Sequence, residues 1–270
     1  FRRIVMSGSQ QISLLRRSIF WLCILIAVAG VTYHYQENIF KEGFDSLTAT
    51  NTPKDIPICN VKTNKKLVSL SFDADFGNED IEKILSVLKK YDVKTTFFIT
   101  GNWVEKYPEA VKKMQAAGHD LGNHSYHHKH MPELDAAGIS DEINTVTEKV
   151  KELTGVTMNL FRPPYGDYSN ALLTQAKSLN YYAIQWNIDS QDWKNYGTDS
   201  IVSTILNHKD LKNGSIILMH NGAKYTAEAL PKVIEGLKKK GYEIVPVSNL
   251  IYMDNFHIEP DGSQVQDTSQ

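Results

Sequence analysis

Carboxylates and histidines follow several apolar runs of this sequence. Asp73 and Asp75 come after the alternating segment 67–72, which is typical of a half-buried strand. His124 and His128 are four residues apart, a spacing that on a helical turn brings both imidazoles to one face. Such groups could bind a divalent metal that keeps a position open for water, or could transfer protons. For each of them the alternative is a polar turn without chemistry.

Three more polar residues occupy similar places. Arg162 lies in "FRPPYG", where two prolines stiffen the chain, so its guanidinium could hold a carboxylate bidentately and keep it ionised. Asp192 precedes Trp193, and His220 ends the apolar run "SIILMH". An acid such as Asp192 near His220 would orient the imidazole and raise its pKa, as a general acid requires. The alternatives are a surface arginine, an ordinary turn and a core histidine.

Strands and helices alternate along the chain. Strands are expected at 67–72, 93–100, 120–122, 159–161, 181–187, 215–219 and 242–246. Helices are expected at 81–90, 108–117, 138–153, 169–179, 199–208 and 227–240. This alternation predicts an α/β fold with a mostly parallel sheet covered by helices, either open or closed into a barrel. The polar clusters fall at the carboxyl ends of the strands, where such a barrel gathers its active site.

Five motifs occur in order between about residues 67 and 252: "SFDAD", "HSYHH", "RPPYG", "DSQDW" and "LMH". As a set they resemble the polysaccharide deacetylases of carbohydrate esterase family 4, which share the NodB-homology domain. The resemblance implies a distorted (β/α) barrel that removes N-acetyl groups from peptidoglycan or a chitin-like polysaccharide. It also implies a divalent metal, most commonly Zn²⁺, with Co²⁺ as an alternative.

The same resemblance implies catalytic roles for four residues. Asp73 is similar to the catalytic base, and Arg162 to the residue that holds this base. His220 is similar to the catalytic acid, with Asp192 as its partner. In this chemistry Asp73 takes a proton from the attacking water, and His220 protonates the departing amine of the sugar.

Other matching positions would bind the metal or the substrate. His124 and His128 resemble the metal ligands of the family. Tyr165 would supply a backbone N–H to the oxyanion, and Trp193 and Leu218 would form apolar walls around the acetyl methyl group.

One position departs from the family pattern. The usual motif has two adjacent acids, the base followed by a metal ligand, but here Ala74 follows Asp73. Asp75 comes one residue later, and in a strand that shift points a side chain to the other face. A bulge or the start of a loop could return Asp75 to the metal, so its role as a ligand is left open.

The N-terminal region predicts membrane attachment or export. Residues 18–33 are apolar and follow Arg16 and Arg17, a pattern typical of a membrane anchor or a cleavable signal segment. The positive flank places the rest of the chain outside, so the catalytic domain is expected to be extracytoplasmic, at the cell membrane or secreted. The expected divisions are a basic segment 1–17, the apolar segment 18–33, a linker 34–60, the catalytic domain 61–253 and a polar tail 254–270.

The net charge of the chain limits the classes of molecule that it is expected to bind. A net charge of −2 and an isoelectric point near 6.5 give no electrostatic reason to expect nucleic acid. The expected partners are an N-acetylated glycan and the membrane, and no protein partner is implied. Two other functions remain open: a glycan-binding protein that has lost catalysis, which the departure at Ala74 suggests, and a hydrolase of small cyclic amides.

Overall fold

The computed structural model describes residues 55–267 of the 270-residue chain. Most of its strands form one curled sheet whose paired strands are all parallel, in the order β6-β5-β4-β3-β2-β8-β7, with β9 beside the start of β2. These strands are β2 (Leu67–Ala74), β3 (Thr96–Ile99), β4 (Asp120–Asn123), β5 (Leu160–Phe161), β6 (Tyr182–Ala183), β7 (Ile188–Asp189), β8 (Ile216–His220) and β9 (Glu243–Ile244). The predicted α/β architecture with a parallel sheet is confirmed.

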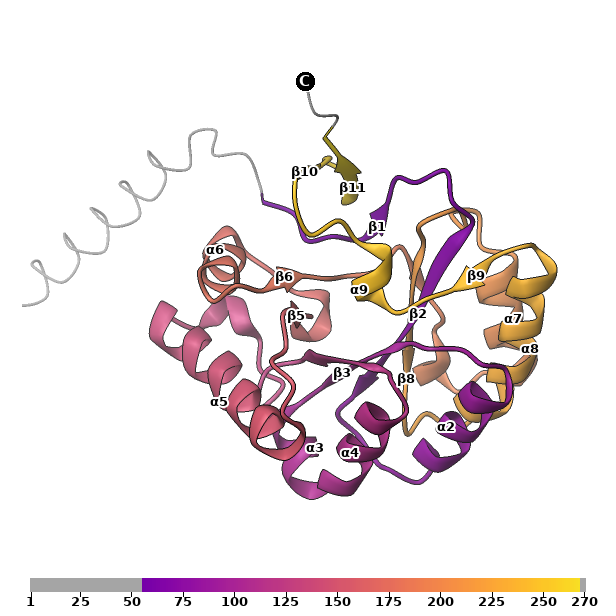
Figure 1. The fold of residues 1–270 in the computed structure, drawn as a ribbon, viewed down its shortest axis with the longest axis horizontal. Coiled ribbons are helices and arrows are strands. Elements are labelled where there is room, and N and C mark those ends of the chain that lie inside the picture. Colours follow the sequence, from indigo (N-terminus) through magenta and orange to yellow (C-terminus); the bar gives the residue numbers. More distant parts are fainter. Residues whose placement is uncertain (1–54, 268–270) are drawn as a thin grey trace, which may run out of the picture. The chain divides into compact units, whose positions relative to one another are not determined.

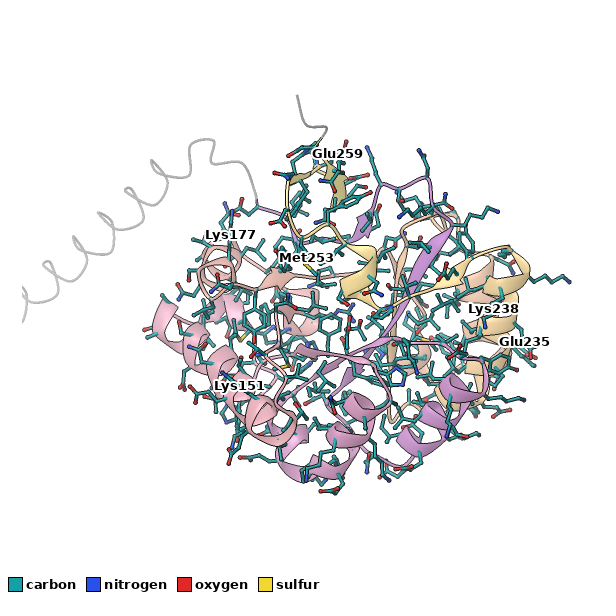
Figure 2. All side chains as sticks on the ribbon, viewed as in Figure 1. Lys151, Lys177, Glu235, Lys238, Met253 and Glu259 are labelled. Carbon is teal, nitrogen blue, oxygen red and sulfur yellow. The ribbon has the colours of Figure 1, made fainter. Side chains whose placement is uncertain are left out.

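Helices surround this sheet (Figure 1). They are α2 (Ile81–Lys90), α3 (Gly101–Lys106), α4 (Pro108–Ala116), α5 (Ala136–Thr154), α6 (Asn170–Ser178), α7 (Thr198–Leu206), α8 (Thr226–Lys239) and the short α9 (Val247–Leu250). Lys151 on α5 and Lys238 on α8 point outward, away from the sheet (Figure 2). Apolar residues at helical spacing face inward instead, such as Ile81, Ile84 and Leu88 of α2, which are fully buried.

The alternation of side chains along β2 separates two apolar layers. Phe72 and Ala74 pack into the large core between the sheet and the helices. A smaller core, which includes Phe98 and Ile184, fills the inside of the curled sheet. Because side chains of a strand alternate between faces, Asp73 points to the side opposite Phe72. The side chain of Asp73 therefore points into the interior of the curled sheet, at the carboxyl edge of β2.

Two predictions of secondary structure were wrong. Of the strand expected at 181–187, only β6 forms, and β7 begins after that range, separated from β6 by four residues. The tail expected to be frayed forms β10 (Phe256–Ile258) and β11 (Ser263–Gln266), which pair with each other, and β11 also pairs with β1 (Asn60–Val61) in a second sheet. Sequence analysis missed them because this pairing joins residues about 200 positions apart in a polar stretch.

The segment at 58–61, expected to belong to the linker and the domain boundary, is part of the folded body. Ile58 forms a parallel bridge with Ile184, next to β6, and Asn60 forms an antiparallel bridge with Ser215, next to β8. This segment therefore spans the opening between the two arms of the curled sheet.

No helix of residues 55–267 is long and apolar enough to cross a membrane. The predicted anchor at 18–33 lies outside the described residues.

Candidate active site

Asp73 and Arg162 form a buried ion pair at the carboxyl edge of the sheet. Nη1 of Arg162 donates to Oδ1 of Asp73 over 2.6 Å, and Nη2 donates to Oγ of Ser71 over 2.8 Å. The guanidinium lies 4.0 Å from the ring centroid of Phe98 and has no access to solvent. The predicted pairing of Arg162 with a carboxylate is present, but the predicted bidentate geometry is not, since Nη2 donates to Ser71 and to the carbonyl oxygen of Gln185 instead.

The surroundings of Asp73 keep it ionised. Burial alone would raise its pKa, but the charges of Arg162, His124 and His220 and the hydrogen bond from Arg162 outweigh burial and lower the pKa. The side chain of Asp73 is 7% exposed. An ionised and nearly dry carboxylate is suited to accept a proton.

His124 is oriented by the chain that carries Arg162. Its Nδ1 lies 2.7 Å from the carbonyl oxygen of Arg162, which can only accept a proton, so the N–H is on Nδ1 and the lone pair is on Nε2. Nε2 lies 3.4 Å from Oδ2 of Asp73. Burial lowers the pKa of His124 to about 4, which leaves the ring neutral at neutral pH.

His128 meets His124 without a helical turn. Residues 124–130 contain no helix, and both Ser125 (φ 63°) and His128 (φ 54°) adopt left-handed conformations. The two imidazole rings nevertheless lie edge to face with centroids 4.8 Å apart. The sequence therefore predicted the right pair for the wrong reason, since a tight loop rather than a helix brings them together.

Asp75 lies beside His128, beyond the end of β2. Its Oδ2 is 3.8 Å from Nδ1 of His128, and its Oδ1 accepts a hydrogen bond from the hydroxyl of Thr100 over 3.1 Å. Ala74 is fully buried in the core between sheet and helices. The start of the loop thus turns Asp75 towards His128. A role as metal ligand depends on such a turn, because a regular strand would have pointed Asp75 to the other face.

The chemistry of these donors fits a divalent metal. A neutral His124 with its lone pair on Nε2, a nearby second imidazole and a carboxylate are the ligand types of a catalytic zinc site with three protein ligands. Among residues 55–267, however, no three His, Cys, Asp or Glu side chains are already grouped to hold an ion. His124, His128 and Asp75 would hold such an ion, with Oδ2 of Asp75, the oxygen that faces His128, as the donor from the carboxylate.

His220 and Asp192 form a second ion pair at this edge. Nδ1 of His220 lies 2.7 Å from Oδ1 of Asp192, and the backbone N–H of His220 donates to Oδ2 over 2.8 Å. The hydroxyl of Thr226 donates to the same Oδ2, so Asp192 is fully buried and fully bonded. Burial works against the charged imidazole, but the hydrogen bond and charge of Asp192 outweigh it and raise the pKa of His220.

The remaining predicted residues lie at the same edge of the sheet. Tyr165 adopts a left-handed conformation (φ 61°), and its exposed ring packs edge to face on His128 with centroids 4.5 Å apart. Trp193 is exposed next to Asp192. Leu218 is buried two residues before His220, so both point to the same face of β8. The structure thus brings all ten predicted site residues to one edge.

Sequence analysis missed Glu142, which holds in place the loop of residues 124–130, the histidine loop. Its Oε2 accepts hydrogen bonds from the backbone N–H groups of Tyr126 and His127, over 2.9 and 2.8 Å. Its Oε1 lies 2.8 Å from both Nδ1 of His127 and Nζ of Lys129. The side chain is 4% exposed. The available signal was its place on the inward face of the helix expected at 138–153, where a charge needs a partner.

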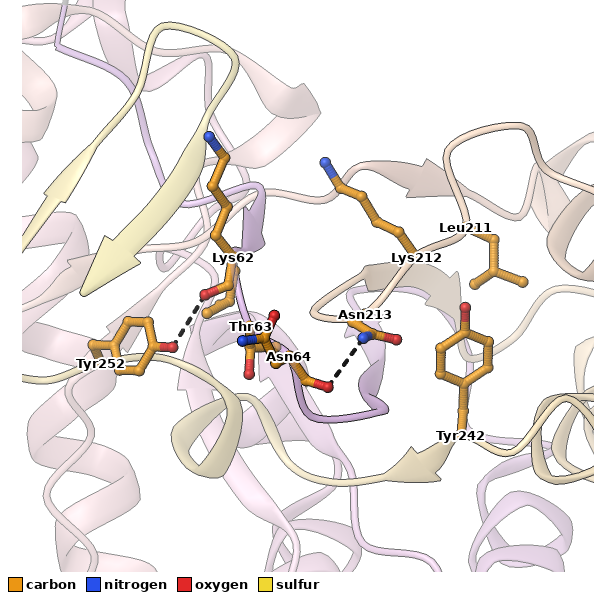
Figure 3. A pocket seen from close by; sticks show the side chains of 9 residues that line it. Lys62, Thr63, Asn64, Leu211, Lys212, Asn213, Tyr242 and Tyr252 are labelled. Atoms are coloured by element: carbon orange, nitrogen blue, oxygen red, sulfur yellow. Dashed lines mark hydrogen bonds between the residues drawn. The ribbon is translucent and has the colours of Figure 1, made fainter.

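A cavity of about 770 Å³ opens at the opposite edge of the sheet, before the strands begin (Figure 3). Lys62, Lys212, Tyr242 and Tyr252 line it together with amide side chains, and none of its lining residues is an acid or a histidine. The predicted carboxylates and histidines therefore lie outside this cavity, at the carboxyl edge of the sheet.

Comparisons with known proteins agree with this arrangement. A family model described as polysaccharide deacetylase matches residues 60–184. The peptidoglycan-N-acetylmuramic acid deacetylase PdaA of Bacillus subtilis is 36% identical over 198 residues, which cover 70% of this chain and 73% of that relative. The chain belongs to the polysaccharide deacetylase family. A peptidoglycan-N-acetylglucosamine deacetylase of Bacillus cereus is 34% identical over 191 residues, which cover 69% of each chain.

Solved structures of this family share the fold. A carbohydrate esterase family 4 pseudoenzyme from Bacillus anthracis superposes with a TM-score of 0.69 at 33% identity, covering 73% of this chain and 69% of that one. The predicted membership and NodB-type fold are confirmed. Since the polysaccharide deacetylase family contains both deacetylases and a pseudoenzyme, the roles of individual residues remain predictions.

Proposed function

We propose that this polysaccharide deacetylase hydrolyses the N-acetyl groups of peptidoglycan amino sugars. The observation that supports this most strongly is the register of β2 and β8, which sets an ionised Asp73 directly beside His220, whose pKa Asp192 raises. The similarity to two peptidoglycan deacetylases, one named for each amino sugar, supports the same substrate class.

The two pairs divide the proton transfers between them. Asp73 accepts a proton from the water whose oxygen attacks the amide carbonyl carbon. The backbone N–H of Tyr165 donates to the carbonyl oxygen as negative charge develops there. When the C–N bond breaks, His220 gives its proton to the amine nitrogen, and the products are acetate and a free amino sugar. Trp193 and Leu218 enclose the acetyl methyl group.

His124 and His128 would hold a divalent metal, with Asp75 as the third ligand. We propose Zn²⁺, with Co²⁺ as the alternative. When bound, such an ion polarises the carbonyl and acidifies the water. The residues described above keep Asp73 ionised and the lone pair of His124 directed towards the site.

The proposed location is the outer side of the cell membrane, or the medium if residues 18–33 are removed. A domain outside the membrane has direct access to the wall polymer. Fractionation of cells followed by N-terminal sequencing of the protein tests this proposal. Recovery of the intact chain from the cytosol alone would contradict it.

Mass spectrometry of muropeptides tests the activity directly. The full chain, loaded with Zn²⁺, is incubated with peptidoglycan, and the muropeptides should lose acetyl groups from one of the two amino sugars. The variant His220→Ala should leave them unchanged. If the folded, metal-loaded chain releases no acetate from peptidoglycan or from N-acetylglucosamine oligomers, the proposal is wrong.

A glycan-binding protein without catalysis is the second candidate. It is favoured by the buried Ala74 in place of an acid and by the similarity to a pseudoenzyme. Such a protein would bind peptidoglycan, contain no metal by elemental analysis and release no acetate. Retention of Asp73, Arg162, Asp192 and His220 in full hydrogen-bonded pairs argues for the enzyme, since binding alone does not require an acid and a base.

A further inference from the structure

The large exposed aromatic side chains of residues 55–267 lie at the edge of the sheet that carries the site. Among residues 55–267, the large hydrophobic side chains that are exposed are Phe76, Tyr165, Trp193 and Tyr196, at 63%, 59%, 53% and 71%. Each belongs to a loop that follows the carboxyl end of a strand, namely β2, β5 or β7. Large apolar side chains left in water at one place usually mark a binding surface.

The backbone that carries Phe76 is held firmly although its ring is exposed. The carbonyl oxygen of the next residue, Gly77, accepts hydrogen bonds from Nδ2 of Asn221 over 2.6 Å and from Nε1 of Trp103 over 3.1 Å. A Cβ atom at Gly222 would lie 3.3 Å from Cβ of Phe76, which shows how closely the two loops approach. Phe76 is thus fixed beside the loop that follows His220.

Tyr196 lies at the end of the turn that carries Asp192. The N–H of Asn195 donates to the carbonyl oxygen of Asp192 over 3.1 Å, and both Gln191 and Asn195 adopt left-handed conformations. Gly197, with φ 99°, follows immediately. The turn that positions the partner of His220 therefore also positions the backbone that carries Tyr196.

Phe76 and Tyr196 are on opposite sides of the strand that carries His220. In the sheet β8 lies between β2 and β7, so the two loops start roughly two strand spacings, about 10 Å, apart. That distance suits a run of linked sugars rather than one sugar. The flat face of a pyranose consists of C–H groups, which pack favourably on the electron-rich face of an aromatic ring.

We propose that Phe76 and Tyr196 stack on the sugars that flank the one being deacetylated, so that binding strengthens as the glycan chain lengthens to reach both rings. This inference rests on the proposed deacetylase function. It assigns to Phe76 and Tyr196 a part in substrate binding that is separate from proton transfer.

The test compares full-length variants on N-acetylglucosamine oligomers of increasing length and on insoluble peptidoglycan. Phe76→Ala and Tyr196→Ala should each raise KM by about 3- to 10-fold on long oligomers, with a smaller effect on short ones and on kcat. Phe76→Leu and Tyr196→Leu keep apolar bulk without a flat ring, and should lose binding like the alanine variants. Phe76→Trp and Tyr196→Phe keep a ring, and should retain wild-type behaviour.

Co-sedimentation with peptidoglycan gives a readout that does not depend on turnover. The alanine and leucine variants should sediment less than wild type, whereas Tyr91→Ala, which alters a tyrosine at the end of α2, should not change. Unaltered KM and sedimentation in all Phe76 and Tyr196 variants would overturn the inference, and so would an equal loss at every oligomer length. A wild-type chain that releases no acetate but needs both rings for sedimentation would refute the deacetylase function alone.

Discussion

Asp73 and His220 lie directly opposite each other on the adjacent parallel strands β2 and β8. Burial works against the charge of both, but Arg162 lowers the pKa of Asp73 while Asp192 raises the pKa of His220. The lowered pKa leaves the carboxylate of Asp73 ionised and able to accept a proton at neutral pH, and the raised pKa of His220 favours the protonated imidazole that a general acid requires. Two neighbouring groups whose pKa values are moved in opposite directions are the usual sign of a base and an acid.

The variant Asp73→Asn should lose acetate release by about 100- to 10,000-fold, the usual contribution of a general base. It should still bind metal, because the imidazoles of His124 and His128 remain. The change also leaves the buried guanidinium of Arg162 without its counter-ion. Urea unfolding should show a loss of stability of about 3–5 kcal/mol.

An exposed ion pair provides the control for Asp73. Asp199 pairs with Lys232 at the surface, with side chains 91% and 58% exposed. Asp199→Asn should leave acetate release and unfolding nearly unchanged, since exposed pairs contribute little. Full activity in Asp73→Asn would remove Asp73 from the mechanism.

The variant Asp192→Asn should move the alkaline limb of the pH profile to lower pH. The raised pKa lets His220 stay protonated to a higher pH than an ordinary histidine. The hydrogen bond and the charge of Asp192 cause this rise in pKa. The stabilisation from the charged pair is fully present below the unfolded pKa of about 6.5, and is lost as pH rises through the raised pKa. Acetate release between pH 5 and pH 10 measures the position of the alkaline limb. An NMR titration measures the pKa of His220.

The exposed pair of His257 and Asp267 is the matched control for that titration. Its atoms are also in contact, Nδ1 to Oδ1, over 2.6 Å, but both side chains are about half exposed. Asp267→Asn should leave the pH profile unchanged. An alkaline limb that does not move in Asp192→Asn would show that His220 is not the acid.

Much of this site could be predicted because parallel strands bring their carboxyl ends to one edge of a sheet. Asp73, Arg162 and His220 each end or follow an apolar run, so their meeting followed from the fold class. The histidine loop could not be predicted in the same way. The loop contains two left-handed residues, Ser125 and His128, and is held by hydrogen bonds to Glu142 and from the backbone of α3. A spacing of four residues favoured a helix instead.

The two polar C-terminal strands could not be predicted, for a related reason. β11 pairs with β1, some 200 residues earlier in the chain, and β10 joins the same sheet through β11. Local patterns carry no information about so distant a partner. Sequence could likewise show that Ala74 replaces an acid, but not where the loop after β2 would carry Asp75.

The variant Glu142→Gln should weaken metal binding without removing a ligand. Glu142 accepts two backbone hydrogen bonds from the loop between the proposed ligands His124 and His128, and burial of a neutral amide in its place leaves Lys129 without its partner. Loss of such an orienting group typically costs 10- to 100-fold in metal affinity. Calorimetric titration with Zn²⁺ measures this loss independently of activity.

Glu148 on the same helix is the control for Glu142, because its side chain is exposed. Glu148→Gln should bind Zn²⁺ like wild type. A saturating concentration of Zn²⁺ should restore most of the activity of Glu142→Gln, since the catalytic pairs are intact. Equal Zn²⁺ affinity in the two variants would show that Glu142 does not position the ligands.

The variant Asp75→Ala decides whether this site has a third protein ligand. The carboxylate of Asp75 already lies 3.8 Å from His128 and is held by a single hydrogen bond from Thr100. We expect Asp75→Ala to lower Zn²⁺ affinity and acetate release together, and His128→Ala to abolish both. Thr100→Val, which frees the carboxylate to turn towards the histidines, should leave Zn²⁺ bound at least as tightly. If Asp75→Ala keeps full affinity and rate, Asp75 is a turn residue, and the metal is held by the two histidines alone.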